Sequence, residues 1–186
     1  MIGVILAGGA SSRFGGEPKG LKMLRGLPLV GHVHATLSMV CADVVIECMP
    51  GSGYEGWGVE CISARPEHAG KGPLAGILAG LERAAGDQLV LFAPCDMPLL
   101  APPLFERLAR EVGGGWAVSP LGDEPLVCAL PARLRDAVAR SLDLAAIPRV
   151  VHVLGGAGAS GVRFADDWPF VNVNTPEDLA RLEASF

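Results

Sequence analysis

The fold is decided by the stretch Val4-Ile5-Leu6-Ala7-Gly8-Gly9-Ala10-Ser11-Ser12-Arg13-Phe14-Gly15-Gly16-Glu17-Pro18-Lys19. A short apolar run ends at paired glycines, and two serines, an arginine, more glycine and a lysine follow. Because glycine tolerates positive φ and lets the backbone approach a ligand closely, successive N–H groups can point at phosphate oxygens. Arg13 and Lys19 add the full positive charges that a polyphosphate attracts. The stretch therefore predicts a nucleoside triphosphate loop at the carboxyl end of a first strand.

Two common phosphate-binding loops do not fit this stretch. A Walker loop needs a hydroxyl residue directly after its lysine, whereas Lys19 is followed by Gly20. The dinucleotide fingerprint G-x-G-x-x-G is absent as well. The loop is therefore of a third kind.

The composition indicates one folded domain and argues against a membrane protein, a nucleic-acid-binding protein and a zinc or disulfide-rich protein. Of 186 residues, 50% are apolar and 19% charged, so we expect one domain over residues 1–186 with a substantial core. No apolar run reaches the ~18 residues of a membrane span, and we expect a cytoplasmic protein with no membrane contact. The net charge of −5 argues against nucleic acid as a partner. Five scattered cysteines without a C-x-x-C pair argue against a zinc site and against a disulfide framework. Separately, we expect a monomer or a weak oligomer.

Strand-like and helix-like segments alternate along the chain. This alternation predicts an α/β fold: a single three-layer αβα domain with a mainly parallel, twisted, Rossmann-like sheet. The predicted strands are residues 2–7, 44–46, 59–62, 89–92, 116–119, 126–130, 161–164 and 170–173. The predicted helices are residues 29–40, 73–81, 103–112, 131–142 and 147–154, with a last helix from Pro176. Ligands bind such sheets beyond the carboxyl ends of the strands, near a switch in strand order.

A second glycine-rich turn lies at Gly70-Lys71-Gly72-Pro73-Leu74-Ala75-Gly76-Ile77. Taken alone, it reads as a turn that leads into an amphipathic helix, because proline fits a first helical turn. Since two of the three lysines fall in the first loop and Lys71 falls here, both turns are candidates for binding a small anion.

An acidic residue, Asp96, follows the clearest inner strand in the run Ala93-Pro94-Cys95-Asp96-Met97-Pro98. Magnesium that bridges phosphates takes one or two carboxylates, with phosphates and water as further ligands. Asp96 is therefore the predicted metal ligand, with a turn-forming role as its structural alternative.

Two asparagines occur near the carboxyl end, in Phe170-Val171-Asn172-Val173-Asn174-Thr175-Pro176-Glu177-Asp178-Leu179. In a strand, alternation would put Asn172 and Asn174 on the same face, where their amides could bind a ligand. Asn174 could equally shape only the strand-to-helix turn. Thr175 is the predicted N-cap of the last helix.

These motifs, taken in order, resemble the molybdenum cofactor guanylyltransferase family. The resemblance rests on L-A-G-G-A-S-S-R-F-G, G-P-L-A-G-I, C-D-M-P and N-V-N-T-P-E-D-L, and it runs from Leu6 to Leu179. It implies the nucleotidyltransferase fold and transfer of GMP from GTP to molybdopterin, with Mg²⁺ (or Mn²⁺ in its place) and release of pyrophosphate. It also implies transient contact with molybdopterin-handling proteins or molybdoenzymes. Phe14 replaces the usual methionine, and Pro18 stands where many members carry aspartate.

Carried over position by position, the resemblance assigns the site residues. The GTP contacts are Leu6, Ala7, Gly8, Gly9, Lys19 and Asp96; the catalytic residues are Arg13, Lys19 and Asp96; the metal ligand is Asp96. Contacts to the base or the pterin are expected from Glu47, Arg65, Glu67, Gly72, Asn172 and Asn174. Because the attacking phosphate is already anionic, this reaction needs no side-chain base.

Two positions depart from the family pattern. Glu47 stands where the family often has asparagine, and Arg65-Pro66-Glu67 stands where an aspartate commonly precedes the G-P-L-A-G segment. Guanine presents donors at N1 and N2, so a carboxylate acceptor suits it. We therefore expect Glu47 or Glu67 to read the base.

Three other functions remain open on the sequence alone. A molybdopterin cytidylyltransferase typically has L-A-A-G in the first motif and lacks the G-P-L-A-G string. A sugar-phosphate or methylerythritol-phosphate nucleotidyltransferase shares the Pro18-Lys19 pair but differs in the later motifs. A non-catalytic cofactor-binding module of the same fold is the third.

Overall fold

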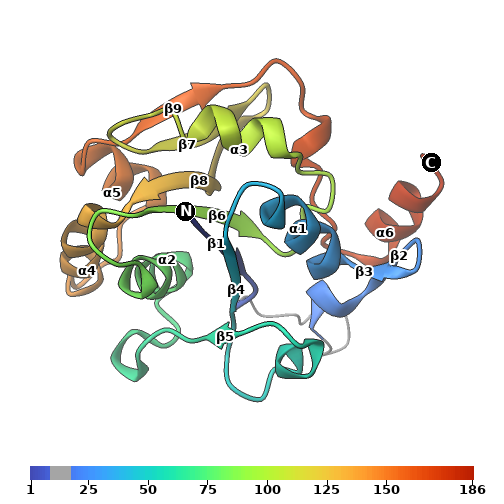
Figure 1. The fold of residues 1–186 in the computed structure, drawn as a ribbon, viewed down its shortest axis with the longest axis horizontal. Helices are drawn as coiled ribbons and strands as arrows, with labels where there is room; N and C mark the ends of the chain where they lie inside the picture. Colours follow the sequence, from blue (N-terminus) through green and yellow to red (C-terminus); the bar gives the residue numbers. More distant parts are fainter. Residues whose placement is uncertain (9–17) are drawn as a thin grey trace.

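The computed structural model describes residues 1–8 and 18–186 and contains a seven-stranded sheet (Figure 1). The strand order is β5-β4-β1-β6-β8-β7-β9. The strands are β1 (Ile2–Leu6), β4 (Asp43–Glu47), β5 (Cys61–Ile62), β6 (Leu89–Pro94), β7 (Gly115–Ser119), β8 (Gly122–Pro131) and β9 (Ser160–Arg163). All neighbours pair in parallel except β8, which is antiparallel to both β6 and β7. The predicted α/β class with a mainly parallel sheet is confirmed.

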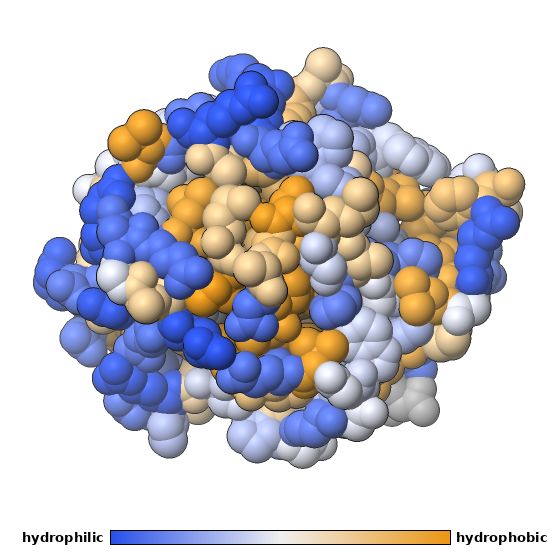
Figure 2. Space-filling view, viewed as in Figure 1, coloured by the Kyte–Doolittle hydropathy of each residue, from blue (hydrophilic) through white to orange (hydrophobic). Residues whose placement is uncertain are grey.

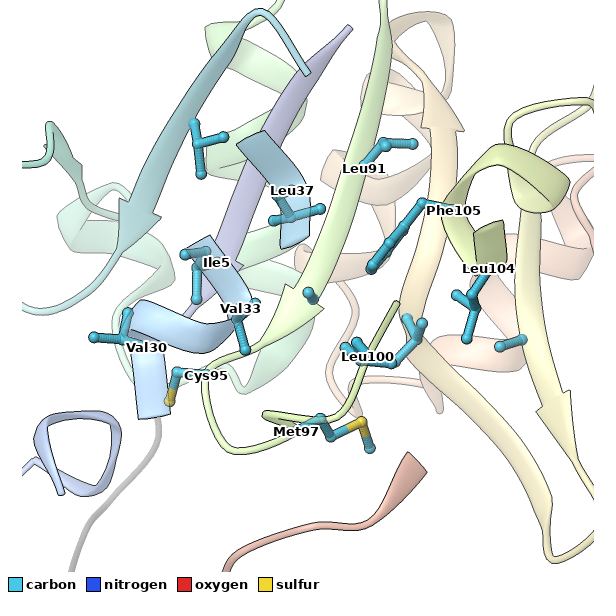
Figure 3. Close-up of a cluster of buried hydrophobic side chains, with 14 of the residues drawn as sticks. Ile5, Val30, Val33, Leu37, Leu91, Cys95, Met97, Leu100, Leu104 and Phe105 are labelled. Carbon is cyan, nitrogen blue, oxygen red and sulfur yellow. The ribbon is translucent and has the colours of Figure 1, made fainter. Parts of the chain in front are cut away.

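Helices cover both faces of the sheet, which gives three layers. One face carries α1 (Leu29–Ser38) and α3 (Pro102–Leu108), and the other carries α2 (Pro73–Arg83), α4 (Arg135–Leu142) and α5 (Val150–Gly156). Adjacent residues of β1 serve opposite cores, since Val4 packs with the α2 side and Ile5 with the α1 side. Figure 3 shows the α1–α3 core, in which Leu37 and Phe105 lie against the sheet.

The order of the strands creates a switch point between β1 and β6. From β1 the chain passes through α1 to β4 and β5 on one side, and then through α2 to β6 on the other side. Leu6 and Pro94, the last residues of β1 and β6, are register partners. The carboxyl ends of these two strands therefore meet where such folds bind ligands.

The predicted strand at residues 170–173 is wrong. Residues Trp168–Phe170 form a short 3-10 helix, η6, and residues 171–174 have no regular secondary structure and do not join the sheet. Pro169 lies at the start of that turn and has no N–H to give to a ladder. A backbone bond from the Val173 N–H to the Asp96 carbonyl, at 2.9 Å, connects the segment to the residue after β6.

Other elements differ from the prediction in extent. Two short strands that were not predicted, β2 (Met23–Leu24) and β3 (Leu27–Pro28), form an antiparallel hairpin. The predicted helix at 131–142 begins as the 3-10 turn η5 (Ala132–Leu134), and the predicted strand at 126–130 is the second half of β8. The remaining elements are η2 (Lys19–Leu21), η3 (Tyr54–Trp57), η4 (Pro66–His68) and α6 (Pro176–Glu183).

The carboxyl-terminal helix α6 packs on the β2–β3 hairpin. Leu182 of α6 shares a small buried cluster with Leu24, Leu29 and Val173. This cluster joins the segment that follows Lys19 to the segment that contains Asn174. Both segments are thereby held at one end of the sheet.

Within residues 1–8 and 18–186, every helix is too short or too polar to cross a bilayer. Figure 2 shows an apolar area near the centre of one face, bordered by hydrophilic side chains. Since apolar atoms make up more than half of the surface of folded proteins in general, this area alone assigns no partner.

Candidate active site

An ion pair between Lys19 and Asp96 forms the centre of the candidate site. Lys19 begins η2, and Asp96 follows the end of β6 by two residues. The Lys19 ammonium donates to Oδ2 of Asp96 across 77 residues of sequence. The Asp96 side chain is 7% exposed and that of Lys19 is 24% exposed. The structure thus brings together the two charged residues that the sequence assigned to phosphate and metal.

Asn174 completes this cluster. Its Oδ1 accepts a hydrogen bond from Lys19 Nζ at 3.5 Å. Its backbone N–H donates to Asp178 Oδ2 at 3.0 Å, and Asp178 also caps α6 by a reciprocal pair of bonds with Thr175. The predicted N-cap at Thr175 is confirmed. Asn172 is exposed two residues earlier.

The first residues of the glycine loop are fixed between two strands. The Leu6 carbonyl accepts from the Cys95 N–H at 3.1 Å, and the Ala7 N–H donates to the Glu47 carbonyl at 2.8 Å. Leu6, Ala7 and Gly8 therefore lie at the switch point, beside the residue that precedes Asp96. Gly9 and Arg13 lie outside the described residues, so their predicted roles stay predictions.

Glu47 ends β4 with a buried carboxyl group, 8% exposed as a residue. Burial raises the pKa of this carboxyl, against the opposing effect of hydrogen bonds from the backbone of Ala64 and Gly8. A Cβ at Gly8 would lie 2.9 Å from its Oε2, and a Cβ at Gly76 would lie 2.7 Å from the same atom. The carboxyl group thus fits between the start of the phosphate loop and α2 because the residues on either side, Gly8 and Gly76, have no side chain.

The second glycine turn does not send its lysine to the site. Lys71 Nζ donates to the Leu142 carbonyl at 2.9 Å, at the end of α4. Gly72 precedes α2 with φ of 75°, a conformation that favours glycine. The turn therefore sets where α2 begins, and Lys71 donates to the carbonyl of the last residue of another helix, α4.

Arg65 and Glu67 are exposed and lie away from the Lys19–Asp96 pair, with Glu67 in the turn η4 and Arg65 just before it. Arg65 pairs with Glu82 of α2 at 2.5 Å and with Glu67 at 3.9 Å. With His68 and residues of α2 and α4, Arg65 lines a hollow of about 330 Å³. This hollow is beside the later part of α2, at Leu78 and Glu82.

The residues at the rim suit a single hard cation. Asp96 and Asn174 offer oxygen atoms, which Mg²⁺ and Mn²⁺ accept, and Asp96 lies beside the predicted phosphate loop. Across the part of the chain that the structure describes, no three His, Cys, Asp or Glu side chains group together as a metal cage. One carboxylate plus substrate phosphates is the arrangement typical of magnesium, and the donor set fits it.

One residue of the site was not found by sequence reasoning. Tyr54 has a buried hydroxyl that accepts from the Gly20 N–H at 3.1 Å and lies 3.9 Å from Cys95 Sγ. It belongs to no motif of the chain. The only signal in the sequence is that it is the sole tyrosine.

Comparison with known proteins agrees with this geometry. Residues 3–159 match the model of a MobA-like NTP transferase domain. The chain is 35% identical to a molybdenum cofactor guanylyltransferase of Ralstonia pickettii (strain 12J), covering 98% of this chain and 95% of the relative. It is 38% identical to the same enzyme of Rhodobacter capsulatus, with the same coverage.

Solved structures share the fold over nearly the whole chain. The molybdopterin-guanine dinucleotide biosynthesis protein A of Archaeoglobus fulgidus superposes with a TM-score of 0.80 at 25% identity, covering 100% of this chain and 98% of that protein. A CMP:2-keto-3-deoxy-manno-octonic acid synthetase complexed with CTP reaches 0.74 at 14% identity, with 99% and 97% covered. The chain is a nucleotidyltransferase and belongs to the molybdenum cofactor guanylyltransferase family.

Proposed function

We propose that the protein transfers GMP from GTP to molybdopterin, releasing pyrophosphate and forming molybdopterin guanine dinucleotide. The observation that carries the proposal is the convergence of Lys19, Asp96 and Asn174 at the switch between β1 and β6. A positive group and an oxygen donor set meet there, beside the backbone of Leu6–Gly8, which suits a metal-bound triphosphate. The names of the curated relatives supply the identity of the two substrates.

Lys19 is the residue that neutralises the triphosphate. In the structure its ammonium is paired with Asp96 and bonded to Asn174. On GTP binding, the ammonium turns from the carboxylate to phosphate oxygens, and Asn174 stays within its reach. The ammonium then neutralises the negative charge that develops in the transition state.

Asp96 is the residue that holds Mg²⁺, with Mn²⁺ as a substitute. When bound, the ion neutralises phosphate charge and favours departure of pyrophosphate. Asp96 is suited to this because it is nearly buried and its main-chain carbonyl is fixed by Val173. Because molybdopterin brings its own anionic phosphate as nucleophile, the chain has only to position and to neutralise.

Glu47 is better placed than Glu67 to read guanine. It lies at the end of β4, next to Gly8, whereas Glu67 is 60% exposed and paired with Arg65. An ionised carboxylate has about four acceptor positions. The N–H groups of Gly8 and Ala64 use two, which leaves acceptors for N1 and N2 of the base.

Comparing GTP with ITP tests this reading, because ITP lacks the N2 amino group. We expect Glu47→Gln to abolish the preference for GTP, and Glu67→Gln, the matched control, to keep it. If both variants prefer GTP as strongly as the wild type, neither residue reads the base. Asn172, Gly72 and Arg65 remain predicted contacts to the base or the pterin.

The function is tested by pyrophosphate release with paired nucleotides and acceptors. GTP and CTP are each offered with molybdopterin and with a sugar phosphate. We expect turnover only with GTP and molybdopterin. Turnover with CTP would make the protein a cytidylyltransferase, turnover with the sugar phosphate would make it a sugar-phosphate enzyme, and nucleotide binding without any turnover would leave a cofactor-binding module.

A further inference from the structure

Tyr54 lies beneath the active-site ion pair, in the core between the sheet and α1. It is 1% exposed and opens η3, the turn that follows β4. Its hydroxyl accepts a hydrogen bond from the backbone N–H of Gly20 at 3.1 Å. The same hydroxyl is 3.9 Å from Sγ of Cys95, close enough for a sulfur hydrogen bond. One oxygen atom thus contacts two segments that are far apart in the sequence.

Both contacts are immediate neighbours of the ion pair. Gly20 follows Lys19, and Cys95 precedes Asp96. The three segments approach so closely that a Cβ at Gly20 would lie 2.6 Å from the Tyr54 hydroxyl and 3.1 Å from the Cys95 Cβ. Glycine at position 20 is therefore what admits the hydroxyl. Figure 3 shows Cys95 just beyond the end of β6, beside Val30 of α1.

A lysine in this position needs such an anchor. Its ammonium stands on a flexible four-carbon stem, so the place it reaches depends on where its backbone is held. In η2 the backbone bonds of the turn itself, from Leu21 and Lys22 to Pro18 and Lys19, are local, and the Lys22 carbonyl accepts from the Leu29 N–H at the start of α1. The bond from Gly20 adds a tie to Tyr54, which packs in the core between the sheet and α1.

We propose that Tyr54 is a positioning residue, which fixes Lys19 opposite Asp96 by holding the Gly20 N–H and contacting Cys95. The inference rests on the proposed function for the identity of the ligand, and it assigns Tyr54 no contact with substrate. The phenol keeps its proton throughout, because burial raises its pKa far above the ordinary value. Burial likewise raises the pKa of Cys95 to about 12, so the contact between hydroxyl and thiol is a neutral one.

A double-mutant cycle separates this role from a merely structural one. The variants are Tyr54→Phe, Lys19→Gln and the pair together, and the readout is the Kd of the magnesium nucleotide. We expect Tyr54→Phe to weaken binding about fivefold in the wild type and less than about twofold when Lys19 is already glutamine. Equal losses in both backgrounds, or no loss in the wild type, would overturn the inference.

The control is Ser141→Ala. Ser141 is another buried hydroxyl, which donates to the Val138 carbonyl at 2.6 Å within α4, away from the site. We expect it to lower stability without changing the Kd. If Ser141→Ala weakens binding as much as Tyr54→Phe does, the effect of Tyr54 is one of stability alone and the inference fails.

The assay is independent of the acceptor and of the base. Nucleotide Kd requires no molybdopterin, and the cycle is run with whichever of GTP and CTP the wild type binds more tightly, so an error in the proposed function leaves the test intact. If Tyr54→Phe does not fold, growth on 3-fluorotyrosine replaces the single tyrosine with a weaker acceptor of nearly equal size. The inference then predicts about a twofold rise in Kd that Lys19→Gln removes; an unchanged Kd rejects it.

Discussion

Oε2 of Glu47 lies 2.7 Å from the point where a Cβ of residue 76 would stand, closer than real Cβ contacts allow. Gly76 is in the middle of α2, where glycine weakens a helix by about 0.5–1 kcal/mol relative to alanine. The second glycine of G-P-L-A-G is therefore explained by a buried carboxyl group at the end of β4.

This relationship predicts that the effect of Gly76→Ala on the free energy of unfolding changes sign when Glu47 is replaced by alanine. In the wild type the added methyl must displace the held carboxyl, and we expect a loss of about 1–2 kcal/mol in the free energy of unfolding. In the Glu47→Ala background we expect a gain of up to about 0.5–1 kcal/mol, because the helix preference then opposes only a small shift of the Leu6 methyl group, which lies 3.1 Å from the added Cβ. Urea unfolding of the four proteins measures both values. An equal effect in both backgrounds would show that Glu47 does not impose the glycine.

Asp96→Asn should lower activity while leaving the stability of the fold nearly unchanged. Asparagine keeps the shape but removes the charge that holds the metal, so we expect pyrophosphate release to fall by about 10² or more. Lys19 is partly exposed and can hydrate its ammonium, so the thermal midpoint should change little. Asp87→Asn is the matched control, because Asp87 is also paired, at 2.6 Å with Arg133. Near-normal turnover in the Asp96 variant would contradict the metal assignment.

The stability of the protein should depend on pH through Glu47. Burial raises the folded-state pKa of this carboxyl above its ordinary value of 4.5. Between the unfolded and folded pKa values the native state binds more protons, so this group makes stability fall as the pH rises through that window. Glu47→Gln removes the fall. We expect the stability of the variant relative to the wild type to grow as the pH rises above 4.5.

Denaturant unfolding at a series of pH values checks this expectation. Only the difference between variant and wild type is interpreted, since the other carboxyl groups titrate in both. A difference that is constant from acid to neutral pH would mean that Glu47 titrates alike in the folded and unfolded chain.

Asp178 is expected to affect nucleotide binding from a distance. Its Oδ2 accepts from the backbone of Asn174 and Thr175, and these bonds lower the pKa of Asp178. Asp178→Asn weakens both bonds, so we expect a loss of about 0.5–2 kcal/mol in stability and about a threefold rise in the Kd for GTP with magnesium. Glu177→Gln, in the same helical turn, is the control. Equal nucleotide affinity in Asp178→Asn and Glu177→Gln would show that the bond from Asn174 to Asp178 does not affect nucleotide binding.

Much of the sheet and its helices could be predicted because each follows a clear periodicity. The strands β1, β4 and β6 are short runs rich in aliphatic and β-branched residues, and α2 has a continuous apolar face. The run at 170–173 has a similar pattern, but it follows Pro169 and begins inside the 3-10 turn η6, and it joins no strand of the sheet. The hairpin of β2 and β3 has two residues per strand, too few for a pattern.

The charged residues of the site were predictable, whereas their supports were not. Lys19 and Asp96 belong to motifs whose chemistry is legible from residue type and from the strand end that precedes each. Tyr54 acts through packing and one backbone N–H, and neither leaves a local signal. For Lys71 the sequence predicts too much. A lysine between glycines indicates an anion-binding turn, but its ammonium donates to the Leu142 carbonyl instead.

The site assignment is tested most directly by a crystal soaked with GTP and Mn²⁺ and measured at the manganese absorption edge. We expect an anomalous peak beside the carboxylate of Asp96, with the triphosphate along Leu6–Gly8 and the Lys19 ammonium on its oxygens. Manganese far from Asp96, or a triphosphate bound at another edge of the sheet, would contradict it.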